Sequence, residues 1–211
     1  MKALKCHHCQ NDAIYKCRLC GHLLCSEHTE FRTICPEHKK KATLRYTIKE
    51  KASCDNAEIR QIVEKLWGED EQLTHDRTYN VPNLSGYIVK SKGALIGFVS
   101  TGEIDDDILI VALGVLPEYQ SLGIGKALVK KVEDVASRMK KKRLFVSTSN
   151  DDLPALAFYQ TNGFQIYEVK PNVIAMKHGK IISGIAGLPV RDELRLQKTV
   201  QGEKNKTLQK D

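Results

Sequence analysis

Eight cysteine and histidine side chains near the N-terminus form four pairs, and two residues separate the members of each pair. The pairs are Cys6/Cys9, Cys17/Cys20, Cys25/His28 and Cys35/His38. Two ligands at this spacing can reach one ion from a tight turn, and thiolate and imidazole are the ligands that tetrahedral Zn²⁺ prefers. Because eight ligands fill two tetrahedra and leave no position for water, the sequence predicts two structural Zn²⁺ ions.

Residues 1–40, which carry these pairs, are too few to bury a stabilising apolar core, so bound metal would supply the missing stability. Three disulfides are the alternative, which the two histidines at matching spacing disfavour. The pattern resembles the B-box class of cross-brace zinc domains, in which the first and third pairs share one ion and the second and fourth share the other. This resemblance implies one site of Cys6, Cys9, Cys25 and His28 and a second site of Cys17, Cys20, Cys35 and His38.

A second chemical signal is the glycine-rich turn Gln120-Ser121-Leu122-Gly123-Ile124-Gly125-Lys126, which precedes a segment with helical periodicity. Glycines let the backbone approach a ligand, and the first amides of a helix have no internal partner and lie at the positive end of its dipole. Such a turn can hold a pyrophosphate, although it can also be no more than a tightly packed helix entry. It matches neither a Walker loop nor a complete dinucleotide fingerprint.

The elements that position these residues follow from hydrophobic periodicity. We expect helices over residues 55–67, from the glycine turn to Met139, and over 152–161. We expect strands at 44–49, 86–90, 95–102, 108–115 and 143–148, a final hairpin of 164–169 with 173–176, and a loop over 69–82. Helices interspersed among strands predict an α/β or α+β fold, with a mixed sheet that is covered on both faces.

Two segments resemble the signatures of the GNAT superfamily of N-acetyltransferases. Leu113 to Gly125 is similar to the acetyl-CoA motif Q/R-x-x-G-x-G/A, with Gln120, Gly123 and Gly125 at its fixed positions. About 35 residues further on, Asn150 to Phe164 resembles the second signature, a strand-end Asn followed by a helix with F-Y-x-x-x-G-F. The order of strands and helices also fits, so the resemblance covers residues 43–178 and implies a GNAT-type domain there.

The resemblance implies that acetyl-CoA lies against the end of the central strand and the glycine turn. Tyr159 would lie beside the thioester sulfur as the catalytic residue, and a phenol, protonated at neutral pH, can donate to the departing thiolate. An acceptor amine would attack directly while a backbone N–H stabilises the oxyanion, without a covalent enzyme intermediate. The implied cofactor-binding residues are Leu113, Gly114, Val115, Gln120, Ser121, Leu122, Gly123, Ile124, Gly125, Lys126 and Asn150.

The general base is not identified by sequence, because the apolar central strand holds no carboxylate. Glu103, the run Asp105 to Asp107 and His75 are candidates, each expected at the surface, and water can relay the proton instead. The acidic segment between Glu69 and Asn80 corresponds to the loop that shapes the acceptor pocket in the family, and it could attract a cationic amine. Cys54 at a helix start is a weak candidate nucleophile.

Composition is that of an ordinary globular protein, with 41% hydrophobic and 28% charged residues in 211. The net charge of +7 divides into +3 over residues 1–40, +1 over 41–178 and +3 over 179–211, which argues against a basic nucleic-acid groove in the long middle segment. No apolar run reaches the length of a membrane helix, and residues 1–6 hold no signal-peptide core, so a cytoplasmic protein without membrane contact is expected. Residues 179–211 are expected to form a partly mobile C-terminal extension.

Two hypotheses follow. The first is an acetyl-CoA-dependent N-acetyltransferase that acetylates a primary amine, with a zinc module that recruits a protein or other macromolecular acceptor or another protein partner. The second is a non-catalytic acyl-CoA-binding scaffold or regulator that acts through the zinc module. The glycines, Asn150 and Tyr159 favour the enzyme, because a scaffold does not need that set.

Overall fold

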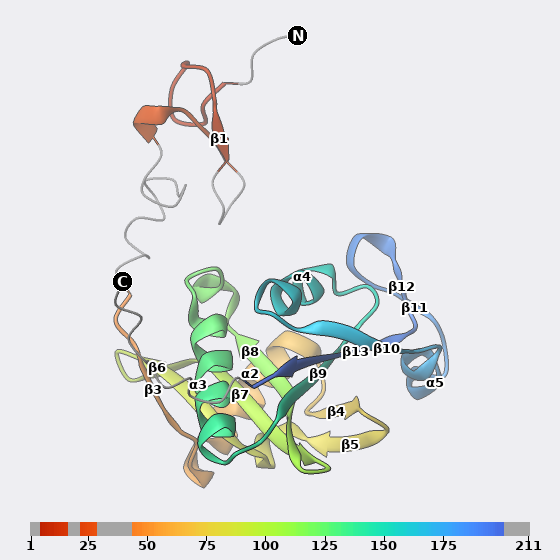
Figure 1. The fold of residues 1–211 in the computed structure, drawn as a ribbon. Coiled ribbons are helices and arrows are strands. Elements are labelled where there is room, and N and C mark those ends of the chain that lie inside the picture. The colour runs from red at the N-terminus through yellow and green to blue at the C-terminus, as the bar shows by residue number, and fades with distance from the viewer. Residues whose placement is uncertain (1–4, 17–21, 29–43, 201–211) are drawn as a thin grey trace, which may run out of the picture.

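The computed structural model describes residues 5–16, 22–28 and 44–200. Its centre is a sheet of seven strands in the order β10-β13-β9-β8-β7-β6-β3 (Figure 1). Every neighbouring pair is antiparallel except β8 and β9, which run parallel. The strands are β3 (Thr47–Glu50), β6 (Ser85–Ser91), β7 (Ala94–Ile104), β8 (Asp107–Val115), β9 (Arg143–Ser149), β10 (Gln165–Lys170) and β13 (Glu193–Thr199).

Helices cover both faces of this sheet, as the sequence predicts. The α-helices are α2 (Asn56–Trp67), α3 (Ile124–Arg138), α4 (Leu153–Thr161) and the short α5 (Val173–His178). In Figure 1, α3 crosses in front of the sheet and α2 lies behind it. Three small antiparallel pairs complete the described residues: β1 (Tyr15–Lys16) with β2 (Leu23–Leu24), β4 (Glu71–Thr74) with β5 (Arg77–Asn80), and β11 (Ile182–Ser183) with β12 (Pro189–Val190).

Two apolar cores hold the helices on the sheet. The apolar face of α3, which includes the fully buried Leu128 and Val132, packs with Ile110 of β8 and Val146 of β9. On the opposite face, Ile59, Ile62 and Val63 of α2 pack with Phe98 of β7 and Ala112 of β8. These positions recur at helical spacing in the sequence, and burying each large aliphatic side chain contributes about 1.5–3 kcal/mol.

The central strand β8 contains a bulge where its pairing with β9 ends. Ser100 pairs with Ala112 and Thr101 with Ile110, so Val111 is an extra residue in β8. The bulge turns Ile110 toward the α3 core and Ala112 toward the α2 core. The last pair between β8 and β9 is Ile110 with Val146. Beyond this pair the two parallel strands separate, and the backbone of β8 from the bulge to Val115 has no partner on β9.

Three sequence expectations differ from the structure. The segment 173–176 is helix α5 and not a strand, so β10 pairs with β13 (Glu193–Thr199) in place of a following hairpin strand. Because β13 lies inside the sheet between β10 and β9, the expected domain end at residue 178 is too early. The expected loop 69–82 contains the β4–β5 hairpin, whose turn residues His75 and Asp76 both have positive φ.

No helix among the described residues is long and apolar enough to cross a membrane.

Candidate functional site

A cavity of about 710 Å³ lies at the separated end of β8, between the glycine turn and helix α4. Leu66 and Trp67, at the end of α2, also line it. The cavity thus brings together the two sequence motifs, which are about 35 residues apart in the chain. Its lining includes nearly all the residues predicted to bind cofactor, namely Leu113, Gly114, Val115, Gln120, Ser121, Gly123, Ile124, Gly125 and Lys126.

The glycine turn presents a row of free backbone amides. Among the described residues, the N–H groups from Ser121 through Lys126 have no hydrogen-bond acceptor, and the first bond of α3 is from the amide of Ala127 to the carbonyl of Gly123. The side chain of Gln120 donates to the carbonyl of Val115 at 3.0 Å, which ties the turn to the end of β8. Free amides at the positive end of a helix dipole favour an anionic ligand such as a phosphate.

The two glycines of the turn serve different purposes. Gly123 has φ of +85°, and a Cβ atom placed there would meet no atom within 4 Å, so its surroundings are open. A Cβ atom on Gly125 would lie 3.3 Å from the ring of Phe158, so this glycine lets α4 approach α3. Gly123 therefore gives a ligand access to the backbone, whereas Gly125 serves helix packing.

Tyr159 lies on the wall of the cavity with only 7% of its surface exposed. Its ring packs edge-on against Phe158 and Phe164. Burial, with a smaller contribution from the charge of Asp152, raises the pKa of the Tyr159 hydroxyl above its ordinary value. The hydroxyl therefore stays protonated at neutral pH and is available as a donor.

Two predicted cofactor-binding residues do not line the cavity. Leu122 is part of the turn, but only its backbone amide belongs to the free row. The side chain of Asn150 donates to the carbonyl of Pro189 at 2.8 Å and accepts from the amides of Arg191 and Asp192 at 2.9 and 2.8 Å. These contacts give Asn150 a structural role, holding the segment that leads into β13.

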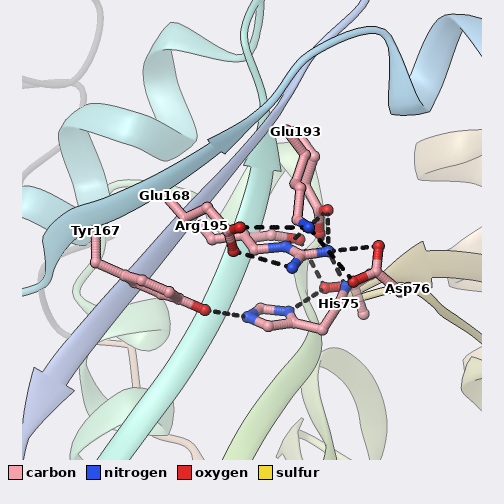
Figure 2. A network of polar contacts seen from close by, with 9 residues as sticks. His75, Asp76, Tyr167, Glu168, Glu193 and Arg195 are labelled. Carbon is pink, nitrogen blue, oxygen red and sulfur yellow. Dashed lines mark hydrogen bonds and ion pairs between the residues drawn. The ribbon is translucent and has the colours of Figure 1, made fainter.

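A second group of polar residues surrounds His75, in the turn between β4 and β5 (Figure 2). His75 is 7% exposed, which corrects the expectation that it lies at the surface. One ring nitrogen, Nε2, lies 3.1 Å from the hydroxyl of Tyr167, and the other, Nδ1, lies 2.9 Å from that of Thr74. The Thr74 hydroxyl in turn lies 2.7 Å from that of Ser147 on β9. We call Thr74, His75, Ser147, Tyr167 and the charges beside them the His75 cluster.

Buried charges fix the backbone of His75. Its amide donates to Glu193, which is 2% exposed, at 3.0 Å. The guanidinium of Arg195, itself 5% exposed, contacts Glu193, Glu168 and Asp76 at 2.9 to 3.0 Å. Burial is the main cause that lowers the pKa of His75; Arg195 acts in the same direction, while Glu193, Asp76 and Glu168 oppose it. The imidazole is therefore neutral at pH 7.

The other candidate bases have different surroundings. Asp107, 4% exposed, accepts hydrogen bonds from the amides of Lys142 and Arg143 and from the Arg143 side chain, so it fixes the start of β9. Glu103 and Asp106 are exposed, as expected. Cys54 is also exposed, in a short 3-10 helix outside both the cavity and the His75 cluster.

Near the N-terminus, the first and third Cys/His pairs lie together. The sulfur atoms of Cys6, Cys9 and Cys25 and a ring nitrogen of His28 all lie within 4.8 Å of one another, and the three cysteines are free thiols. The Cys9 and Cys25 sulfurs are 3.7 Å apart. A tetrahedron with Zn–S bonds of about 2.3 Å has S···S edges of about 3.8 Å, so the group has the dimensions and donor types of a zinc site. The second predicted set, Cys17, Cys20, Cys35 and His38, lies outside the described residues.

Sequence reasoning missed most of the His75 cluster. Thr74, Ser147, Tyr167, Glu193 and Arg195 come from four different strands, and no short motif connects them. The one available signal was His75 itself, an imidazole within an acidic segment, together with the Arg-Asp-Glu run before β13.

Comparison with known proteins gives a consistent result. Residues 56–164 match the model of the acetyltransferase (GNAT) family. The uncharacterized protein YxbD of Bacillus subtilis is 31% identical over 143 residues, which cover 65% of this chain and 89% of that protein. The ribosomal protein bS18-alanine N-acetyltransferase of Escherichia coli K12 is 24% identical over 98 residues, 46% of this chain and 66% of that protein.

Among solved structures, a GNAT family acetyltransferase from Elizabethkingia anophelis, with acetyl-CoA bound, superposes with a TM-score of 0.55 at 20% identity. The match covers 73% of this chain and 97% of that one. At this identity the likeness shows a common fold.

Proposed function

The chain belongs to the GNAT family of N-acetyltransferases, and we propose that it transfers the acetyl group of acetyl-CoA directly to a primary amine. The observation that carries the proposal is the row of free amides from Ser121 to Lys126 on the wall of the cavity at the separated end of β8. The open surroundings of Gly123 leave room for phosphate oxygens against this backbone.

Different residues of the chain would serve cofactor binding and acetyl transfer. The amides of the turn, with Lys126 beside them, would hold the pyrophosphate. The backbone of β8 between the bulge and Val115, which has no partner on β9, would orient the pantetheine arm and the acetyl carbonyl. Acetyl-CoA supplies an activated thioester, and Tyr159, protonated and on the cavity wall, would donate to the sulfur that departs.

The acetyl acceptor that we propose is an amine on a protein. This is supported by the similarity to the bS18-alanine N-acetyltransferase, whose name specifies a protein acceptor. An α-amine or a lysine amine is mostly protonated at neutral pH, so the site must also remove a proton before or during attack.

The test is release of free CoA thiol with two peptide probes, one with a free N-terminal alanine and one with an internal lysine and a blocked N-terminus. We expect turnover with at least one probe and calorimetric binding of acetyl-CoA. Binding without turnover on these probes or on cell-extract proteins would favour an acyl-CoA-binding scaffold, and absence of binding would refute the proposal.

We also propose that Cys6, Cys9, Cys25 and His28 hold one Zn²⁺ and that the remaining set, Cys17, Cys20, Cys35 and His38, holds a second, so that a structural zinc module can recruit a protein. Four protein ligands leave no open position, so this zinc would stabilise the fold and take no part in acetyl transfer.

Native mass spectrometry of the full chain tests the zinc sites. We expect two Zn²⁺ ions in the wild type, one fewer in Cys25→Ser, and no change in the matched control Cys54→Ser, whose thiol is exposed and outside the module. A Cys25→Ser variant that keeps the wild-type metal content would remove this residue from the ligands.

A further inference from the structure

A continuous chain of hydrogen bonds runs through the His75 cluster. It begins at the Ser147 hydroxyl, passes through Thr74 at 2.7 Å and His75 at 2.9 Å, and ends at the Tyr167 hydroxyl 3.1 Å beyond. Figure 2 shows the last of these contacts, between His75 and Tyr167. With the proton of the neutral ring on Nε2, each group donates to the next: Ser147 to Thr74, Thr74 to Nδ1, and Nε2 to Tyr167. Every member then has both a donor and an acceptor, as proton transfer along a chain requires.

The inner end of this chain lies where β8 and β9 separate. Ser147 directly follows Val146, the last residue of β9 that pairs with β8. The β4–β5 hairpin, which carries Thr74 and His75, lies against this part of the sheet, since the Tyr79 ring and the bulge residue Val111 both border Gly102. The proposed transfer site, along the part of β8 that has no partner on β9, begins at the same bulge.

The outer end reaches solvent. Tyr167 is 41% exposed, and with His75 and Arg195 it lines an open hollow of about 200 Å³. The hydrogen bonds therefore connect Ser147, next to the point where β8 and β9 stop pairing, with bulk water. A tyrosine placed only for packing would not need an aligned imidazole beneath its hydroxyl.

The charges around His75 keep the imidazole able to accept a proton. Those that face it are Glu193 and Arg195 from β13, Glu168 from β10 and Asp76 from the turn. Arg195 is in contact with all three carboxylates, so none of them is left to hold an imidazolium. His75 contacts only hydroxyl groups through its ring nitrogens.

We propose that Ser147, Thr74, His75 and Tyr167 form a proton relay that deprotonates the acceptor amine. The inference rests on the proposed acetyl transfer and adds the path of the proton. The N–H bond of the ammonium breaks and its proton passes to Ser147; the Ser147 proton moves to Thr74, and that of Thr74 to Nδ1. The Nε2 proton moves to Tyr167, and the Tyr167 proton leaves to water. The net change is one proton from the amine to solvent, with no charge left on the chain.

Thr74 offers the sharpest test, because one substitution removes the hydroxyl and another retains it. Thr74→Val keeps the shape of the side chain and breaks the relay, whereas Thr74→Ser keeps the hydroxyl. Acetylation of the N-terminal alanine peptide, or of the lysine peptide if the wild type prefers it, is measured in the full chain at pH 6.5 and 9.5. Calorimetric affinity for acetyl-CoA checks that each variant is folded.

At pH 6.5 the amine is protonated, and we expect Thr74→Val to lower kcat about 10²-fold and Thr74→Ser to lower it less than about threefold. At pH 9.5 an α-amine is already neutral, so the defect of Thr74→Val should shrink to about threefold or less. For the lysine peptide the defect should shrink in the same direction but less. His75→Gly, which suits the positive φ at this position, should lose activity in the same way and regain it with added imidazole.

Three results would overturn the relay: Thr74→Val as active as wild type at pH 6.5, a defect of equal size at both pH values, or an equal defect in Thr74→Ser. The equal defect at both pH values is what a purely structural role predicts. Turnover by the wild type tests the proposed acetyl transfer by itself, whereas the ratios of kcat between variants test only the relay.

Discussion

The cavity at the glycine turn and the His75 cluster flank the same separation of β8 from β9, but they are built in opposite ways. The cavity relies on backbone groups of one continuous turn, and its amides are free. The His75 cluster relies on side chains from β4, β9, β10 and β13, and its ring nitrogens and carboxylates all have partners.

This difference indicates which half of the site is general and which is particular to this chain. A phosphate-binding turn needs only glycine and a helix start, so it can be the same for any acceptor. The side that meets the acceptor must fit one amine and remove its proton, and side chains from separate strands can be exchanged one at a time. We therefore expect changes in the cavity to alter acetyl-CoA use and changes in the cluster to alter stability and proton transfer.

The largest effect is expected from Tyr159→Phe, which removes one hydroxyl from the cavity wall and keeps the ring between Phe158 and Phe164. If the hydroxyl donates to the departing sulfur, kcat should fall by about 10²- to 10⁴-fold while the affinity for acetyl-CoA changes little. Single-turnover measurements separate chemistry from product release. An unchanged chemical step would show that Tyr159 only packs.

Arg195→Met tests whether the His75 cluster is held by its buried charges. The substitution introduces an apolar side chain of similar length, but it leaves Glu193 buried without its cation. We expect the free energy of unfolding to fall by about 3–5 kcal/mol in denaturant titrations. The control is Lys130→Met, which breaks the exposed pair with Asp134 and should cost at most about 1 kcal/mol. Equal losses in the two variants would contradict the assigned role of Arg195.

Gly123→Val tests the backbone of the cavity and has a closely matched control. Gly93, in the turn between β6 and β7, also has φ of +85° and open surroundings, so Gly93→Val imposes the same backbone strain far from the cavity. Both variants should lose similar stability, but only Gly123→Val should weaken acetyl-CoA binding, by about 10²-fold, because hydrogen bonds to charged groups each contribute about 1.5–3 kcal/mol. If the two variants have similar affinities for acetyl-CoA, the turn serves helix packing and does not bind the cofactor.

The same contrast explains how far sequence reasoning reached. The strands from β6 to β9 and helices α2, α3 and α4 were predicted because each has its own hydrophobic period. The glycine turn that lines the cavity could be recognised because it is a contiguous motif. Helix α5 was predicted as a strand because Val173 and Ile174 favour strands; in the structure the segment is helical, and β10, at the edge of the sheet, pairs with β13. The partners of His75 could not be predicted, because strand order and register bring them together.

The smallest expected effect is a pH dependence of stability that originates in His75. Burial lowers the folded-state pKa of this imidazole below the value of about 6.5 that it has in the unfolded chain. As pH falls through 6.5, the unfolded chain takes up a proton that the folded chain does not, so the wild type loses stability with falling pH, by at most about 1.4 kcal/mol per pH unit.

His75→Gln removes this titration and keeps a polar side chain. The unfolding free energy of the wild type should therefore fall relative to that of His75→Gln as the pH is lowered from 7.5 to 5.5. Both free energies are measured by denaturant titration. The control is His178→Gln, the same substitution at an exposed histidine at the end of α5, outside the His75 cluster. If the difference between wild type and His75→Gln is constant over this range, His75 titrates alike in the folded and unfolded chains. The cluster would then differ from the cavity only in its composition.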